Sequence, residues 1–353
     1  MTDCTESMLS AVRNALERQR PLRISAGGSK QHIAGRSCAA EMLDISAHRG
    51  IVDYQPGELV ITARAGTALV DIVTALAAEN QILPFEPPQF AGRATLGGTL
   101  ACNLSGPARP WYGSVRDAVL GTRLINGKAE LLRFGGQVMK NVAGYDISRL
   151  QAGAMGTLGI MTEISIRVLP RPESSVTLRY EMLAPEAVAV MNQRAGQTRP
   201  LSGAFWLDGK LYLRISGAES AVQHTAKIWG GDLLGAAEDL WSELRDMSLP
   251  FFAGDEPLWR LSLNSSAVPS GYPAQALIDW GGAQRWLRGD FLLPELQRVA
   301  QKAGGHATLF SGGDRSGEVR PTPGAAAQGL QRRLKHAFDP QGILNPGRLY
   351  GWL

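Results

Sequence analysis

The first half of the chain alternates between helical and strand patterns of apolar residues. Apolar residues recur at the 3.6-residue spacing of a helix over residues 5–19 and 68–80, and Thr67 is placed to cap the second helix. Short apolar or alternating runs predict strands at 22–25, 41–46, 50–67, 118–127, 129–135 and 156–170. An Asn-Gly turn joins two of these strands, and Pro170 ends the last. This half is therefore predicted to be a mixed α/β unit.

From about residue 175 the pattern changes to longer alternating runs. Antiparallel strands are predicted at 175–183, 203–217 and 256–265, with a last hairpin at 275–289. Helical spacing is found at 183–194, 219–231, 293–305 and from 329 onward. The segment 311–329 is rich in Gly, Pro and polar residues and reads as a loose connection. The second half is predicted to be an α+β block.

Composition narrows the class of protein. The 36 basic and 32 acidic residues nearly balance and are scattered, which argues against a nucleic-acid surface. Cys4, Cys38 and Cys102 are far apart, which favours a reducing compartment and argues against a metal or iron–sulfur site in this chain. No apolar run is long enough to span a bilayer. We expect a cytoplasmic protein whose contact with the inner face of the membrane, if any, is peripheral or through partners.

The stretch ATLGGTLACNLSGP at 94–107 shows neither the helical nor the strand spacing of apolar residues and is expected to be an irregular glycine loop. Paired glycines also occur in AGGSK at 26–30, and a third glycine turn lies at 153–160. Such turns expose backbone N–H groups that bind phosphate. No Walker A loop and no strand–GxGxxG–helix unit is found. Three such turns predict a long ligand that contains a pyrophosphate.

The order of these motifs resembles the FAD-linked oxidases of the vanillyl-alcohol-oxidase type. The resemblance covers residues 22–172 and about 330–350 and rests on AGGS, ATLGGTLACNLSGP, YGSVRDAVLG, GAMGTLGIMTEISIRVLP and FDPQGILNPG. Within the family, the whole chain is similar to the smaller FAD-binding subunits of bacterial glycolate oxidases. The resemblance implies an α+β chain, with a PCMH-type FAD-binding domain of two α/β subdomains and an α+β cap. The expected boundaries are 1–172 for the FAD domain, 173–328 for the cap and 329–353 for a returning C-terminal segment.

The resemblance also implies cofactor contacts. Pyrophosphate and ribityl contacts would come from Ala26, Gly27, Gly28, Ser29, Thr95, Gly97 and Gly98. Contacts with the ring system and the adenine would come from Asn103, Ser105, Gly106, Gly113, Ser114, Gly159, Ile160 and Asn345. No His stands where this family attaches FAD covalently, so non-covalent FAD is expected. Lys140, Asn141 and Tyr145 would lie near the flavin, whereas Asp146 and Arg149 are expected to pair with each other.

Two residues are candidates for the chemistry. Oxidation of a 2-hydroxy acid needs a base for the hydroxyl proton and a cation for the carboxylate. His306 falls near the position of a catalytic His in related larger subunits, and Arg109 adjoins a cofactor loop. The paired-His metal element of those relatives is missing, so no metal site is expected. The default role for Trp259, Trp280 and Trp286 is core packing.

Three interpretations stay open. In the first, the chain is a flavin subunit that oxidises glycolate, and probably D-lactate, within a complex containing a second FAD subunit and an iron–sulfur subunit. In the second, it binds FAD in that complex but only relays electrons or serves as a scaffold. In the third, it is a stand-alone oxidase for an unrelated alcohol.

Overall fold

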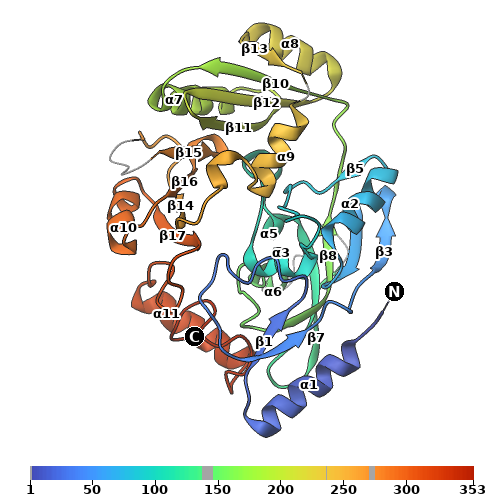
Figure 1. The fold of residues 1–353 in the computed structure, drawn as a ribbon. Coiled ribbons are helices and arrows are strands. Elements are labelled where there is room, and N and C mark those ends of the chain that lie inside the picture. The colour runs from blue at the N-terminus through green and yellow to red at the C-terminus, as the bar shows by residue number, and fades with distance from the viewer. Residues whose placement is uncertain (1, 137–145, 236, 270–274) are drawn as a thin grey trace.

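The structure is a computed structural model and describes residues 2–136, 146–235, 237–269 and 275–353. Figure 1 shows two lobes, with the N-terminal segment and the C-terminal helix in the lower lobe and a large sheet in the upper lobe. The mixture of helices and sheets confirms the predicted α+β class. No helix among the described residues is both long enough and apolar enough to cross a bilayer.

The lower lobe is built around a five-stranded antiparallel sheet. Its strand order is β3-β4-β8-β6-β7, with bounds β3 (Ile51–Gln55), β4 (Val60–Arg64), β6 (Val119–Ile125), β7 (Leu131–Gly135) and β8 (Ile160–Arg167). Beside it lie a parallel pair and a short antiparallel pair: β1 (Leu22–Ser25) with β2 (Glu41–Asp44), and β5 (Gln81–Ile82) with β9 (Leu169–Pro170). The central strand β8 buries side chains on both faces because helices and loops cover both.

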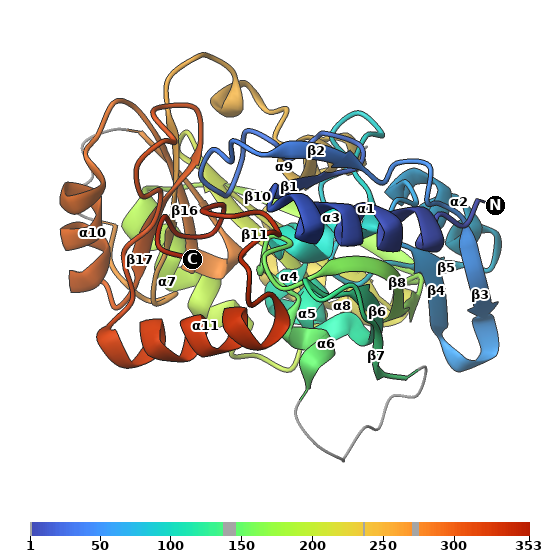
Figure 2. The same cartoon turned by 90° about the horizontal axis from the view of Figure 1, so that it is seen from below.

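Helices of the lower lobe pack on this sheet by their apolar faces. In α1 the buried residues Met8, Val12 and Ala15 recur at helical spacing. In α2 the buried residues are Leu69, Ile72 and Leu76. The bounds are α1 (Thr5–Arg18), η1 (Pro56–Glu58), α2 (Leu69–Ala78), α3 (Leu96–Cys102), α4 (Arg109–Tyr112), α5 (Val115–Ala118) and α6 (Ile147–Leu150). The C-terminal helix α11 (Ala325–Phe338) lies on the underside with α1, as Figure 2 shows.

The upper lobe is an eight-stranded antiparallel sheet in the order β13-β10-β12-β11-β15-β16-β14-β17. Its strands are β10 (Ser174–Glu181), β11 (Leu201–Leu207), β12 (Lys210–Gly217), β13 (Asp232–Leu234), β14 (Leu258–Ser262), β15 (Ala276–Asp279), β16 (Gln284–Arg288) and β17 (His306–Ser311). Its helices are α7 (Ala184–Ala195), α8 (Glu219–Trp229), α9 (Glu238–Asp246), η2 (Pro250–Phe252), η3 (Trp280–Gly282) and α10 (Leu293–Lys302). The predicted hairpin at 275–289 is confirmed.

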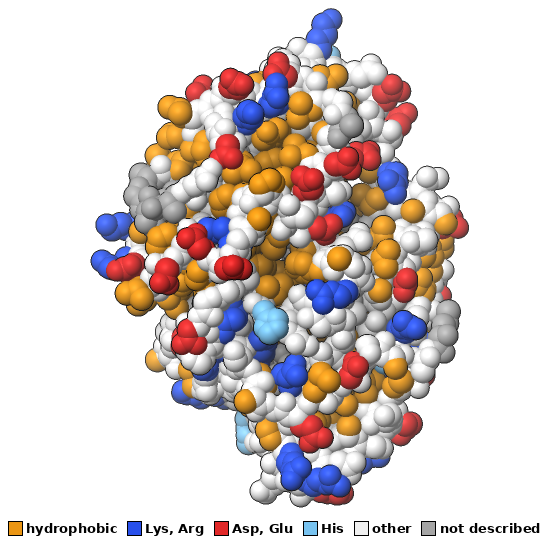
Figure 3. All heavy atoms as spheres, in the orientation of Figure 1, with side chains coloured by type: hydrophobic (Ala, Val, Ile, Leu, Met, Phe, Trp, Pro, Cys, Tyr) orange, Lys and Arg blue, Asp and Glu red, His pale blue; other side chains and the backbone are white. Residues whose placement is uncertain are grey.

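The two lobes share an apolar cluster, so the sheet acts as a cover on the lower lobe. Ala34, Leu104 and Met155 of the lower lobe pack with aromatic side chains such as Phe310 and Trp286 from the sheet. Trp259, Trp280 and Trp286 are 4%, 9% and 3% exposed, which confirms that they are core residues. On the face seen in Figure 3, acidic and basic side chains are interspersed without a large patch of one sign.

Three local predictions are corrected by the structure. Thr67 does not cap α2, because its hydroxyl is engaged with the backbone of Gly50 and the helix begins after Ala68. The stretch 94–107 is not wholly irregular, since α3 occupies Leu96–Cys102. The last helix begins at residue 325, within the segment expected to be loose. The domain boundaries remain a prediction.

Candidate cofactor and substrate site

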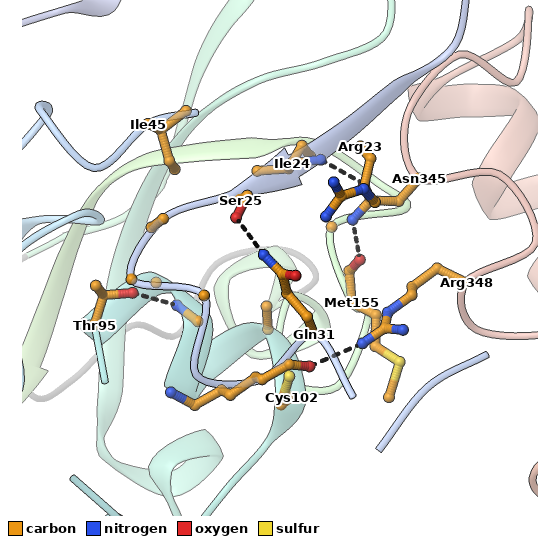
Figure 4. A pocket seen from close by; sticks show the side chains of 18 of the residues that line it. Arg23, Ile24, Ser25, Gln31, Ile45, Thr95, Cys102, Met155, Asn345 and Arg348 are labelled. Atoms are coloured by element: carbon orange, nitrogen blue, oxygen red, sulfur yellow. Dashed lines mark hydrogen bonds between the residues drawn. The ribbon is translucent and has the colours of Figure 1, made fainter. Parts of the chain in front are cut away.

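A cavity of about 410 Å³ lies in the lower lobe, within the range of roughly 300–1,000 Å³ usual for cofactor sites. It is lined by segments distant in sequence: the end of β1 with its loop, the start of α3, the turn at 155–156 and the C-terminal tail. Figure 4 shows these segments converging, with Ser25, Thr95, Cys102 and Asn345 around one space.

The loop after β1 supplies free backbone donors. The N–H groups of Gly27, Gly28 and Ser29 make no hydrogen bond with the part of the chain that the structure describes. Gly28 has a φ of +69°, and a Cβ on Gly27 would stand 1.9 Å from the carbonyl oxygen of Arg93. Glycine is therefore needed at both positions, and the loop forms the anion-binding nest that its sequence predicts.

The second glycine motif lines the cavity as a helix rather than a turn. Thr95 caps α3, with its Oγ1 accepting from the N–H of Gly98 at 3.3 Å. A Cβ on Gly97 would meet the Cβ of Ala65 at 2.7 Å, so glycine lets α3 approach β4 closely. The two glycine motifs therefore lie next to each other and line one cavity, which we call the cradle.

Asn345 brings the C-terminal tail to this cradle. Its Oδ1 accepts from the N–H of Ile24 at 2.7 Å, and its Nδ2 donates to the carbonyl of Met155 at 2.5 Å. The side chain lines the cavity while joining β1 to the turn at 155–156, as the dashed lines in Figure 4 show.

The cavity brings together only part of the predicted cofactor set. Ala26, Gly27, Gly28, Ser29, Thr95, Gly97, Gly98, Gly159 and Asn345 line it. Asn103, Ser105, Gly106, Gly113, Ser114 and Ile160 do not. Among these, Ser105 accepts from the N–H of Val115, Ser114 caps α5, and Ile160 is fully buried. Their contacts with a cofactor stay a prediction.

Lys30 was missed by the sequence reasoning, which took only Ala26, Gly27, Gly28 and Ser29 of AGGSK as cofactor contacts. Its side chain lines the cavity, and the residue is 8% exposed. Burial lowers the pKa of the Lys30 ammonium to about 8. The sequence signal that could have identified Lys30 is a Lys close to a glycine pair of the phosphate-binding type.

On the cover, the candidate His306 begins β17 and pairs in register with Ser262 of β14. The residue as a whole is exposed and lies on an edge strand of the sheet. Partial burial, together with Arg260 and Arg320, lowers the pKa of His306. Arg109 is half-buried, with its guanidinium 4.4 Å from the ring centre of Trp280.

Arg260 was also missed, because nothing in LWRLS marks it as more than a strand residue. It lies on β14 opposite Thr308 and Trp286, with its guanidinium 5.6 Å from the ring centre of Phe310. Its Nε is buried without a hydrogen-bond partner among the described residues. Burial and nearby Arg320 and Arg109 lower its pKa to about 10, so it remains a cation at neutral pH.

Cys102 links this cationic group to the cavity. Its thiol lines the cavity and lies close enough to Arg260 and Arg320 to influence the pKa of each. Burial raises the pKa of Cys102, so the thiol is neutral at physiological pH. The arginines of the cover therefore lie toward the Cys102 end of the cavity.

Other candidates lie apart from the cavity or outside the described residues. Arg149 and Asp146 pair at 3.1 Å, which confirms the expected ion pair. Lys140, Asn141 and Tyr145 lie outside the described residues. No group of three potential metal ligands occurs in the described ranges.

The cradle has the chemistry of a dinucleotide site. Unpaired N–H groups from a glycine nest and a buried ammonium are the donors that a pyrophosphate needs. The close approach of α3 to β4 leaves a wall of bare backbone for an extended ligand. The residues present therefore fit FAD.

Comparison with known proteins agrees with this fit. Residues 2–135 match a family model described as FAD binding domain. The chain is 47% identical to glycolate oxidase subunit GlcE of Escherichia coli, over 99% of each chain. It is 31% identical to glycolate oxidase subunit GlcD of Bacillus subtilis, over 50% of this chain and 39% of that one.

A solved structure supports the fold alone. An alkyldihydroxyacetonephosphate synthase superposes with a TM-score of 0.67 at 15% identity, covering 98% of this chain and 76% of that chain. With near-complete coverage of GlcE, the chain belongs to the FAD-linked oxidases of the glycolate oxidase subunit group, and FAD is its cofactor.

Proposed function

We propose that this chain is the flavin subunit of a glycolate oxidase complex and oxidises glycolate and D-lactate to the 2-oxo acid. Bound FAD would supply the acceptor for the hydride of the substrate α-carbon. The proposal rests on the similarity to GlcE and on the half-buried arginines toward the Cys102 end of the cavity.

The observation that carries the proposal is the guanidinium of half-buried Arg260, whose Nε is buried without a hydrogen-bond partner among the described residues. This cation also forms no ion pair with an acidic side chain of the described residues, so a ligand that supplies the negative charge would stabilise it. We assign Arg260, with Arg109 beside it, to the substrate carboxylate. His306, whose lowered pKa keeps it neutral at pH 7, would take the hydroxyl proton.

FAD would be held non-covalently by the glycine nest, the start of α3 and Asn345. Two protons and two electrons leave the substrate, and the electrons must pass onward. The three cysteines are unpaired and far apart in sequence, and the described residues contain no group of three potential metal ligands. We therefore propose an iron–sulfur partner and a second FAD subunit, in the cytoplasm or peripherally on the inner membrane face.

An anaerobic spectrum tests the activity. The purified chain with FAD is titrated with glycolate, and bleaching of the flavin absorbance is expected. Arg260→Met should raise the glycolate concentration that gives half-maximal bleaching by roughly tenfold or more, with unchanged flavin content. The reason is that a hydrogen bond to a charged group contributes about 1.5–3 kcal/mol. Arg194→Met is the matched control, because Arg194 also stacks on an aromatic ring, Trp229.

A flavin that stays oxidised in glycolate would overturn the catalytic role of this chain and favour the alternative, a relay or scaffold subunit. Two observations favour that alternative: the paired-His element is missing from the sequence, and His306 is an exposed residue. In that case, a co-purifying subunit with the paired histidines would restore bleaching.

A further inference from the structure

Lys30 is a buried cation whose partners inside the protein are few. Its Nζ donates to Ser29 Oγ at 3.1 Å and lies 5.3 Å from the ring centre of Phe90. No acidic side chain of the described residues forms an ion pair with it. An ammonium has three donors, so this one retains hydrogen-bonding capacity in a place with little water.

The position of this ammonium points to a particular kind of ligand. It belongs to the glycine nest, directly after the free N–H groups of Gly27, Gly28 and Ser29. It also stands 3.7 Å from where a Cβ on Gly98 would lie, so it adjoins the second glycine motif too. The donors of the cradle and the buried charge therefore converge on one small volume of the cavity.

The backbone of Lys30 is held in place by the C-terminal tail. Arg348 donates from Nη2 to the carbonyl oxygen of Lys30 at 2.9 Å, a contact drawn in Figure 4. The backbone of Lys30 is thus fixed, and its Nζ hydrogen-bonds to the Ser29 hydroxyl within the same loop.

We propose that Lys30 is the counter-charge for the pyrophosphate of FAD and that it takes up a proton when FAD binds. The uptake follows from the environment of the free protein, where burial holds part of the Lys30 population neutral near pH 8. A dianionic pyrophosphate beside the ammonium restores the ordinary preference for the charged form. FAD affinity should then fall as the pH rises from 7 to 9.

Other titratable groups face the same cavity and must be separated from Lys30. They are Arg23, His32, Cys38, Cys102 and Arg348. Burial raises the pKa of both thiols above the tested range. The two arginines are not expected to contribute, because a guanidinium is not deprotonated in proteins. His32 is removed by a control variant, His32→Ala, which should leave the proton uptake intact.

The experiment is calorimetry of FAD binding to the flavin-free protein at pH 8.5, in two buffers of different ionisation enthalpy. Wild type should take up about three-quarters of a proton per FAD, the deprotonated fraction of a group with a pKa of about 8. Lys30→Met should take up none and bind roughly tenfold or more weakly at pH 7. Lys30→Arg should retain most of the affinity and also take up none.

The part of FAD that Lys30 contacts is tested with ADP, which carries the pyrophosphate without the flavin. Lys30→Met should weaken ADP and FAD binding by similar factors, whereas the exposed-site control Lys128→Met should weaken neither. Unchanged FAD affinity, or a loss for FAD but not for ADP, would overturn the assignment. Thermal unfolding of the flavin-free variants shows that they fold, and these readouts do not depend on glycolate activity.

Discussion

At the scale of single residues, Asp279 is a buried acid in the cover. Its carboxylate accepts from the N–H of Trp280 at 2.7 Å and from Nε2 of Gln284 at 3.2 Å. Burial raises the pKa of Asp279 to about 7. The Oε1 of Gln284 is buried without a partner among the described residues, and with the amide turned this oxygen would accept a hydrogen bond from a protonated Asp279.

The first prediction concerns how Asp279 makes the stability of the folded protein depend on pH. The folded protein keeps its proton on Asp279 up to about pH 7, whereas the unfolded chain loses it near pH 4, so stability falls as the pH rises between these values. The difference between 3.8 and about 7 corresponds to about 4 kcal/mol at most. Asp279→Asn should therefore be more stable than wild type at pH 8 and lose that advantage near pH 4.5.

Urea unfolding at both pH values measures this effect. The exposed Asp290→Asn serves as the control and should follow wild type at each pH. An Asp279→Asn variant that is equally destabilised at both pH values would show that the carboxylate is charged in the folded state.

At the scale of elements, α3 is a helix of seven residues that its sequence disfavours. Gly97 and Gly98 weaken an isolated helix by about 1 kcal/mol each relative to Ala. The Thr95 cap and the close contact with β4 offset this cost. The helix therefore depends on tertiary contacts for its stability. Its glycines are needed because bare backbone lines the cavity at this point.

The second prediction tests the cap of this helix. Thr95→Ala removes the acceptor for the N–H of Gly98 and should cost about 1 kcal/mol of unfolding free energy. Thr95→Ser keeps the hydroxyl and should restore most of the loss. Thermal unfolding with and without FAD provides the measurement, and equal losses in both variants would instead implicate the threonine methyl group.

At the scale of the whole molecule, the C-terminal tail closes the structure onto its N-terminal strand. Leu344 forms a parallel bridge with Leu22, and the buried Lys335 Nζ pairs with Asp339 at 2.6 Å and donates to the carbonyls of Thr157 and Leu344. Asn345 then joins β1 to the turn at 155–156. Residues from both ends of the chain therefore define one cavity.

The third prediction tests this closure. Asn345→Ala leaves the N–H of Ile24 and the carbonyl of Met155 without their partner, which should cost about 2–4 kcal/mol of unfolding free energy for two lost hydrogen bonds. FAD affinity should fall too, because the two walls lose their connection. Chemical unfolding and FAD titration measure these losses, and a variant with normal stability but weak FAD binding would reduce Asn345 to a ligand contact.

The sequence by itself determined features that depend on local chemistry. The glycine nest at 26–29 follows from the backbone freedom of glycine, and the alternating apolar runs gave most strands, because one face of each must be buried. The motif order was enough to indicate the FAD-linked family. These features depend only on residues that are close together in the sequence.

Only the tertiary structure decided the rest. Thr67 has the residue type of a helix cap, but its hydroxyl hydrogen-bonds to the backbone of Gly50 instead. The glycine-rich helix α3 forms because it packs closely against the end of β4. The pKa values of Lys30 and Arg260 are lowered because packing removes much of their water, and that packing arises where segments distant in sequence meet. A pattern along the chain records which side chains exist, whereas their solvation depends on what packs over them.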